Sequence, residues 1–410
     1  MAEDRVVVSF ASSLLRAPSA AASRCGANET TTESRSSSGA TDVAIVGGGP
    51  IGLATAIAAR HAGLGVVVLD RGRPPIDGAC GEGLMPDAVD LLRRLGVDLN
   101  RMGGFKFRGI RYLEGDLVVE GTFPDGQGLA VHRADFHSAL VARAEEVGID
   151  LRWGTPARGL ALEGTAALGV ETDDGLVRGR FIVGADGLRS KVRHWAGLEE
   201  ASPAPLRFGM RRHFEAEPWC DFVEVYWGPG CEAYVYGLSP REMGVALLWS
   251  GEKANFDQLL ERFPAVAARL RDAPATSRDL GAGPLDRRVT AVCRGNVALV
   301  GDASGYRDAI TGEGIAKGLH QAMALVESLS RGSLSGYPAA HKRASRLPDA
   351  MTAITMAFER RPRLRRRALA ALAKDPAIFS RLLGIHARAL PIRSLGLGGA
   401  GRLAWRIVAG

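Results

Sequence analysis

Six residues near the start of the recognisable part of the chain could hold phosphate groups. Residues 47–52 read GGGPIG, which satisfies the pattern G-x-G-x-x-G. In that pattern Gly47 permits a tight turn, Gly49 lets the backbone approach a pyrophosphate, and Gly52 allows a helix to pack closely on a strand. Free N–H groups and the dipole of the following helix would then face the phosphates. The spacing predicts a dinucleotide site.

The elements around these glycines support the same interpretation. Residues 43–46 are apolar and read as a buried parallel strand, a helix is predicted to follow to about residue 61, and residues 66–69 form a second apolar run. Asp70 ends that second strand and could accept hydrogen bonds from ribose hydroxyls. Strand, helix and acid together predict a βαβ unit.

Later segments would have to complete such a site. The apolar run 297–300 predicts another parallel strand, and Gly301 and Asp302 follow at its carboxyl end, where ligands of open α/β sheets bind. Arg133 begins a predicted helix over residues 133–147. Its guanidinium suits phosphate oxygens, although a surface arginine at a helix start is the alternative.

On three motifs the chain resembles the flavoproteins related to para-hydroxybenzoate hydroxylase, which include aromatic hydroxylases, flavin halogenases and geranylgeranyl reductases. The motifs are residues 47–52, residues 184–187 with Ser190, and residues 301–304, and the similarity extends over about residues 42–330. The resemblance implies that the dinucleotide is FAD, with NADPH or NADH as reductant.

The resemblance also implies roles for particular residues. Asp302 would hold a ribityl hydroxyl and Arg133 would touch the FAD backbone. The turn with Gly312 and Gly314 would begin a helix aimed at the pyrimidine edge of the flavin. Asp186 would take part in FAD and nicotinamide binding, or else merely cap the turn that follows it.

The reaction is less closely specified, because three chemistries share this scaffold. Residues 80–86 are similar to the flavin-side loop of geranylgeranyl reductases, and residues 186–190 are more like the hydroxylases. The halogenase run W-x-W-x-I-P is absent from the sequence. Because hydroxylases are numerous, an FAD monooxygenase acting on a hydrophobic small molecule leads. A reductase of carbon–carbon double bonds is the alternative, and a halogenase or an inactive flavin-binding paralogue ranks third.

Apart from Cys80 in the loop at residues 80–86, the candidate substrate and catalytic residues come from a block of predicted antiparallel strands at residues 207–250. We expect this sheet to form the wall that faces the flavin. Alternation places Tyr234 and Tyr236 on one face. The further candidates are Tyr226, His213 and Cys80. His213 has a structural role as its alternative, and Cys80 a role as a small buried thiol.

The predicted fold class is α/β, with a Rossmann-type FAD-binding domain, an antiparallel-sheet substrate domain and a C-terminal helical region. Residues 1–40 are predicted to be a disordered extension. Residues 41–195 and 285–332 form a discontinuous FAD-binding domain, residues 196–284 the substrate-binding sheet, and residues 333–410 the helical basic region.

Composition restricts the function further. The five cysteines contain no C-x-x-C pair, which argues against a disulfide framework and a zinc site, so no metal is expected and a reducing, cytoplasmic location fits. No apolar run is long enough for a membrane span. Residues 360–410 hold 12 Lys and Arg against one acid, Asp375. This basic region is either an Arg-rich helical surface or a patch for peripheral membrane contact, and no nucleic-acid partner is expected.

Overall fold

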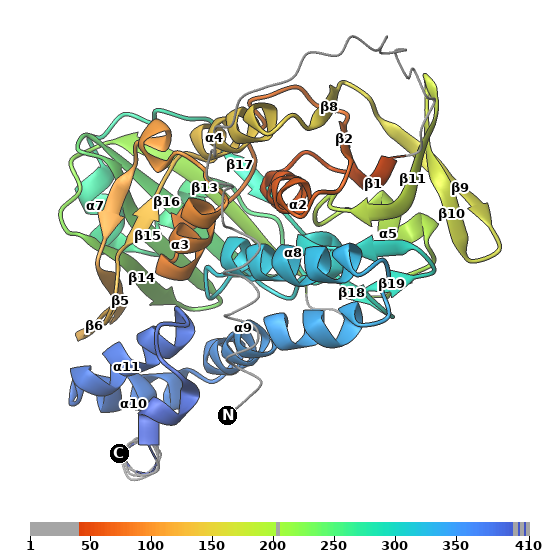
Figure 1. The fold of residues 1–410 in the computed structure, drawn as a ribbon. Helices are drawn as coiled ribbons and strands as arrows, with labels where there is room; N and C mark the ends of the chain where they lie inside the picture. Colours follow the sequence, from red (N-terminus) through yellow and green to blue (C-terminus); the bar gives the residue numbers. More distant parts are fainter. Residues whose placement is uncertain (1–40, 202–205, 397–400, 402–405, 407–410) are drawn as a thin grey trace, which may run out of the picture.

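The computed structural model describes residues 41–201, 206–396, 401 and 406. The predicted disordered extension at residues 1–40 therefore lies outside the described residues. Within them the fold combines a mainly parallel sheet, a mainly antiparallel sheet and a set of C-terminal helices (Figure 1), so the predicted fold class is confirmed.

The parallel sheet carries the predicted βαβ unit. Its central strands are β1 (Thr41–Val46), β2 (Val66–Asp70) and β11 (Gly175–Gly184), with β1 pairing in parallel with both others. The outer strands are β8 (Asp150–Trp153) next to β2, β20 (Val297–Leu299) next to β11, and β19 (Cys293–Arg294) at the edge. Strands β9 (Ala157–Glu163) and β10 (Ala166–Thr172) extend β11 as an antiparallel ribbon.

Helices cover this sheet because its strands are apolar on both faces. Residues 43–46 are buried throughout. Helix α2 (Pro50–His61) packs on α4 (Arg133–Glu146) and on α8 (Gly314–Ser330), and α8 in turn packs on α9 (Tyr337–Glu359). Of the shorter helices, α3 (Pro86–Arg94) packs on α8 and on residues 128–130, and α5 (Lys191–Trp195) packs on β9 and β11. The predicted strand and helix types in this region are confirmed.

The second large sheet runs in the order β17-β13-β16-β15-β14-β5-β6. Its bounds are β17 (Leu280–Ala282), β13 (Arg207–Glu215), β16 (Glu242–Ser250), β15 (Cys231–Ser239), β14 (Phe222–Gly228), β5 (Gly109–Glu114) and β6 (Leu117–Thr122). Strands β5 and β6 come from the stretch assigned by sequence to the FAD-binding domain. They join this sheet because β5 pairs in parallel with β14, a contact between segments more than 100 residues apart that no local pattern reveals.

Small elements close the molecule. A three-stranded sheet joins β3 (Gly83–Leu84), β7 (Gly128–Ala130) and β4 (Phe105–Phe107), and β12 (Glu199–Glu200) pairs with β18 (Arg288–Val289). Helices α6 (Phe256–Leu260) and α7 (Pro264–Leu270) cover the outer face of the second sheet. Short 3₁₀ turns lie at Leu99–Met102, Gly301–Ser304 and Ile392–Leu395.

Each of the two C-terminal helices that pack on the second sheet begins at a proline. Helix α10 (Pro362–Ala373) starts at Pro362 and α11 (Pro376–His386) at Pro376, each proline occupying the first turn, where its missing N–H costs nothing. Both helices pack against β6, at the edge of the second sheet (Figure 1). None of the helices among the described residues combines the length and the apolar character that crossing a bilayer would require.

Candidate functional site

A cavity of about 1010 Å³ extends from the carboxyl ends of the parallel strands, past the second sheet, to the C-terminal helices. Nine of the ten residues predicted to bind the cofactor line it: Gly47, Gly49, Asp70, Arg133, Asp186, Gly301, Asp302, Gly312 and Gly314. The tenth, Gly52, lies just behind the loop in α2. Segments from four distant parts of the sequence therefore meet around one space.

The glycine loop has the geometry that a pyrophosphate requires. Gly47 has a φ of 111°, in the region that side chains rarely adopt. A Cβ on Gly52 would lie 1.9 Å from the carbonyl oxygen of Gly47, so only glycine lets α2 come this close to the turn. At Gly49 the nearest atom to such a Cβ is the Arg133 Nη2 at 4.0 Å, which leaves the backbone open to the cavity.

Charged side chains flank this loop on both sides. The carboxylate of Asp70 accepts hydrogen bonds from the backbone N–H groups of Gly48 and Gly72, both at 2.7 Å, so it fixes the loop while lining the cavity. Arg133 is positioned at the N-terminal end of α4, where burial lowers the pKa of its guanidinium. A partly buried cation beside a helix N-terminus is a suitable environment for phosphate.

The surroundings of Asp302 suit the polar part of a cofactor. Burial raises the pKa of its carboxyl, with the positive charges of Lys317 and Arg133 acting in the opposite sense. Among the hydrogen bonds of the described residues, none holds this carboxylate, although it lines the cavity. Asp302 is only partly exposed, and hydroxyl groups of a bound ligand would give its carboxylate hydrogen-bond partners. The open loop and this carboxylate fit the diphosphate and polyol of FAD.

Asp186 is engaged differently. One carboxylate oxygen accepts from the Ser190 hydroxyl at 2.5 Å, and the other accepts from the backbone N–H groups of Lys191 and Val192 at 2.7 and 3.1 Å. It therefore caps the turn into α5, the alternative left open by the sequence. Since Asp186 also lines the cavity, a role in cofactor binding remains a prediction.

The candidate reactive residues divide into two groups. Cys80 and Tyr234 line the cavity, and burial raises the pKa of the Cys80 thiol, which keeps it neutral. The Tyr234 hydroxyl donates to the carbonyl of Ile310 at 2.7 Å. Tyr236 shares the face of Tyr234, as predicted, and donates to Glu82 at 3.1 Å, just behind the cavity wall.

Two other candidates lie away from the cavity. His213 is buried behind it, with its Nε2 2.7 Å from Oε2 of Glu82. Tyr226 points to the opposite face of the second sheet, where its hydroxyl donates to Glu224 at 2.8 Å. The expectation that Tyr226 faces the flavin is corrected for a simple reason: alternation along β14 turns Val225 and Trp227 toward the cavity and Tyr226 away.

Sequence reasoning missed much of the apolar wall. Tyr112 in β5 faces Trp227 across the cavity end of the sheet, with ring centroids 6.2 Å apart. The remaining apolar lining there includes Leu369, Leu372, Phe379, Leu382 and Leu383 from α10 and α11. The helical spacing of these residues indicates a buried face, but it does not indicate what that face covers.

Sequence reasoning also missed two charged residues at the opposite side. Glu82 and Arg211 both line the cavity, and Arg211 Nη2 lies 2.6 Å from a carboxylate oxygen of Asp77 while its Nε lies 3.4 Å from Glu82. Glu82 lies in the loop at residues 80–86, for which the sequence predicted no role of a carboxylate. Its buried position could have been suspected from the acidic residue between two glycines in an otherwise apolar stretch.

Comparisons with known proteins agree with this site. Residues 40–225 match the FAD binding domain family. The chain is 28% identical over 73% of its length to the menaquinone reductase of Mycolicibacterium smegmatis, covering 78% of that protein, and 26% identical over 69% of its length to the digeranylgeranylglycerophospholipid reductase of Thermoplasma volcanium, covering 76% of it. The structure of a flavoprotein/dehydrogenase from Cytophaga hutchinsonii superposes with a TM-score of 0.76 at 18% identity, over 90% of this chain and 98% of that one. Residues 40–225 are therefore similar to an FAD binding domain, and the fold of the whole chain is that of a flavoprotein.

Proposed function

We propose that the protein is an FAD-dependent reductase of a carbon–carbon double bond in a long, apolar, prenylated substrate. One observation carries the proposal. The cavity does not end beside the cofactor-binding loop but continues into an apolar compartment between the second sheet and helices α9 to α11. A compact aromatic substrate would leave that compartment empty, whereas an extended isoprenoid chain would fill it.

The two ends of the cavity suit such a substrate. At one end Asp302, Arg133 and the glycine loop would hold FAD, which supplies hydride equivalents when reduced. At the other, Phe379 and Leu383 of α11 pack toward the sheet and offer only carbon surface. Burying an apolar chain there is favourable by about 25 cal/mol per Å².

Two further features support a reductase over a monooxygenase. The two curated relatives described above are both named as reductases, and the names of both substrates denote prenyl-bearing molecules. Cys80, in the loop similar to geranylgeranyl reductases, lines the cavity. These features favour the carbon–carbon double-bond reductase, the alternative from the sequence, over the monooxygenase that the sequence placed first.

We also propose that the substrate enters from an anionic membrane surface. Ile354 of α9 lines the cavity while 49% exposed, so it marks an opening. Phe358, one turn later, lines the cavity too, and the exposed Arg360, Arg361 and Arg363 follow it directly. Basic side chains around an apolar opening suit a bilayer with anionic headgroups.

The decisive experiment is anaerobic turnover. FAD-loaded protein is mixed without oxygen with NADPH or NADH and a short-chain prenylquinone or a geranylgeranyl lipid, and the products are analysed by mass spectrometry. The proposal expects a gain of two hydrogen atoms per reduced double bond, undiminished by the absence of oxygen. Product that forms only in air and carries an added oxygen atom would establish a monooxygenase instead.

The remaining candidates give different results in the same assay. A halogenase would form product only in air and only with halide present. An inactive flavin-binding paralogue would oxidise no reduced nicotinamide with any substrate. For the membrane proposal, sedimentation with phosphatidylglycerol vesicles but not with phosphatidylcholine vesicles is expected, and equal sedimentation with both would contradict it.

A further inference from the structure

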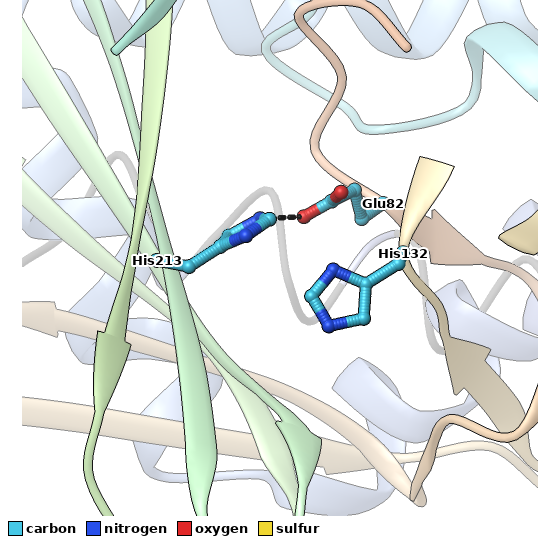
Figure 2. A group of neighbouring side chains, drawn as sticks. All are labelled: Glu82, His132 and His213. Atoms are coloured by element: carbon cyan, nitrogen blue, oxygen red, sulfur yellow. Dashed lines mark hydrogen bonds and ion pairs between the residues drawn. The ribbon is translucent and has the colours of Figure 1, made fainter. Parts of the chain in front are cut away.

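A line of ionisable side chains leads from the cavity to the surface through the second sheet. It begins at Glu82, which lines the cavity, passes His213 in β13 and His132 at the start of α4, and ends at Glu242 in β16. Figure 2 shows the side chains of Glu82 and His213 pointing at one another, with the ring of His132 beside them. Four separate parts of the chain supply these groups.

The contacts along this line are short. His213 Nε2 lies 2.7 Å from Glu82 Oε2, and His132 Nε2 lies 2.7 Å from Glu242 Oε2. Between the two histidines the rings meet edge to face with centroids 4.8 Å apart, and one ligand atom of each of Glu82, His132 and His213 lies within 4.8 Å of the others. One water molecule or a small ring rotation spans such a gap.

The inner pair of side chains is far less exposed than the outer pair. The side chains of Glu82 and His213 are 0% and 5% exposed, while those of His132 and Glu242 are 32% and 21% exposed. Glu242 also accepts a hydrogen bond from the Thr276 hydroxyl at 2.6 Å. Burial acts to raise the pKa of Glu242, but the hydrogen bonds from Thr276 and His132 lower it overall. Glu242 therefore remains an acceptor at the outer end. The inner end is dry and the outer end reaches water.

Glu82 is held in place at a conformational cost. Its φ of 55° lies in the left-handed region, which non-glycine residues adopt at a cost of about 1–3 kcal/mol and which concentrates at functional sites. The backbone N–H of Arg133 donates to Glu82 Oε1 at 3.1 Å, and the Tyr236 hydroxyl donates to Oε2 at 3.1 Å. The fold thus places this carboxylate at the cavity wall although neighbouring conformations would be less strained.

Glu82, His132 and His213 could also be a metal-binding group, but Arg211 opposes that interpretation. Its Nη1 lies 2.9 Å from Nε2 of His213 and its Nε lies 3.4 Å from Glu82 Oε1. A divalent ion held by these atoms would be repelled by a guanidinium at hydrogen-bond distance. Arg211 already supplies the positive charge, with Asp77 as its second partner.

We propose that Glu82, His213, His132 and Glu242 form a proton-transfer chain between the flavin-side cavity and solvent. In its use for double-bond reduction the inference rests on the proposed function. Reducing a double bond adds a hydride, which a reduced flavin supplies, to one carbon and a proton to its neighbour. Glu82 gives the proton from Oε2 and regains one from His213 Nε2, His213 is refilled through His132, and Glu242 recruits the replacement from water.

Neighbouring groups favour this route over others at the inner end. Burial raises the pKa of Tyr236 well above its ordinary value, and burial also raises the pKa of Cys80, so both keep their protons. Arg211 and the N–H of Arg133 stabilise the carboxylate left on Glu82 after it has given up its proton. Of Glu82, Tyr236 and Cys80, Glu82 is the one that both lines the cavity and contacts His213, so it is the inner end of the chain.

The test follows proton uptake without any organic substrate. FAD-loaded protein in weakly buffered anaerobic solution is photoreduced by a light flash with EDTA as the electron donor. A pH-indicator dye reports the protons drawn from water, and the protons that EDTA oxidation releases are subtracted with a blank of free FAD. In the wild type, uptake should keep pace with reduction. In His132→Ala it should be at least tenfold slower, and added imidazole should restore it, while FAD content stays unchanged because His132 does not line the cofactor cavity. Glu242→Gln should slow uptake in the same sense.

The matched control is His194→Ala, since His194 is 73% exposed and pairs with a glutamate, Glu199, at 3.2 Å outside this line. It should take up protons at the wild-type rate. Normal uptake in His132→Ala overturns the relay whatever reaction the enzyme catalyses. The relay is also overturned if the purified wild type contains one zinc ion per chain and His132→Ala has lost it. His132-dependent uptake in an enzyme that reduces no double bond would instead keep the relay and refute the reductase.

Discussion

The two ends of the cavity are built by different means. The cofactor end is made largely of backbone, in a single turn between β1 and α2, where Gly47 and Gly52 touch each other and no side chain fits. The substrate end is made of side chains from β5, β14, α10 and α11, which come from three distant stretches of sequence. A backbone site tolerates almost no substitution, whereas a side-chain wall can change shape residue by residue. The first end therefore fixes the cofactor, and the second can select the substrate.

The largest effect is expected at the cofactor end, from Gly52→Val. Its Cβ would stand 1.9 Å from the Gly47 carbonyl oxygen, so α2 must move away from the loop at a cost of about 3 kcal/mol or more. Bound FAD per polypeptide should fall below a tenth, with a clearly lower melting temperature. The control is Gly336→Ala, where nothing lies within 4 Å. A stable, yellow Gly52→Val protein would show that the backbone account of this end is mistaken.

Asp302→Ala should weaken FAD binding by about 1.5–3 kcal/mol, or roughly tenfold to 150-fold in Kd, because a charge-assisted hydrogen bond is lost. Titration of the apoprotein with FAD measures this. Since burial already raises the pKa of this carboxyl, its removal should leave the apoprotein at least as stable as the wild type. Unchanged FAD affinity would contradict the assignment, and a large loss of apoprotein stability would show that Asp302 has an internal partner.

At the substrate end, Leu372→Trp should change selectivity and leave the cofactor in place. The larger ring would fill part of the apolar compartment, so KM should rise on the order of tenfold for a long prenyl substrate and stay unchanged for a short one. Val118→Trp, on a side chain 49% exposed, is the matched control. Equal effects on both chain lengths would mean that the compartment does not hold the chain.

The smallest effect is expected where the two ends meet, at Glu313. Burial, followed by the charge of Asp87, raises the pKa of Glu313 to about 8 from an ordinary value of 4.5. The folded protein keeps a proton that the unfolded chain releases, so this group contributes stability that is complete below about pH 4.5 and is lost as the pH rises to about 8.

Glu313→Gln cannot titrate, so its stability should fall less between pH 6 and pH 8 than that of the wild type. The difference should be about 1 kcal/mol per pH unit, since a single group can contribute at most about 1.4 kcal/mol per pH unit. Denaturant unfolding at several pH values measures it. Parallel stability profiles in the two proteins would show that Glu313 is ionised in the folded state.

Much of the cofactor end could be predicted because its information is local. The glycine spacing, the strand before it and Asp70 after it lie within 30 residues, and Gly301 with Asp302 again follows directly on an apolar strand. The placement of Tyr234 and Tyr236 on one face also followed from strand alternation. The prediction for Tyr226 was wrong because strand alternation gives only relative faces. Which face lines the cavity depends on how the sheet packs.

The sequence by itself determined the βαβ unit, the prolines that open α10 and α11, and the residue types able to bind a dinucleotide, since these depend on short-range geometry and periodicity. The tertiary structure alone decided that β5 joins β14, that α11 closes an apolar compartment, and that Glu82 meets His213 across 131 residues. Such contacts depend on how complete elements pack against each other, and that information is spread over the whole chain.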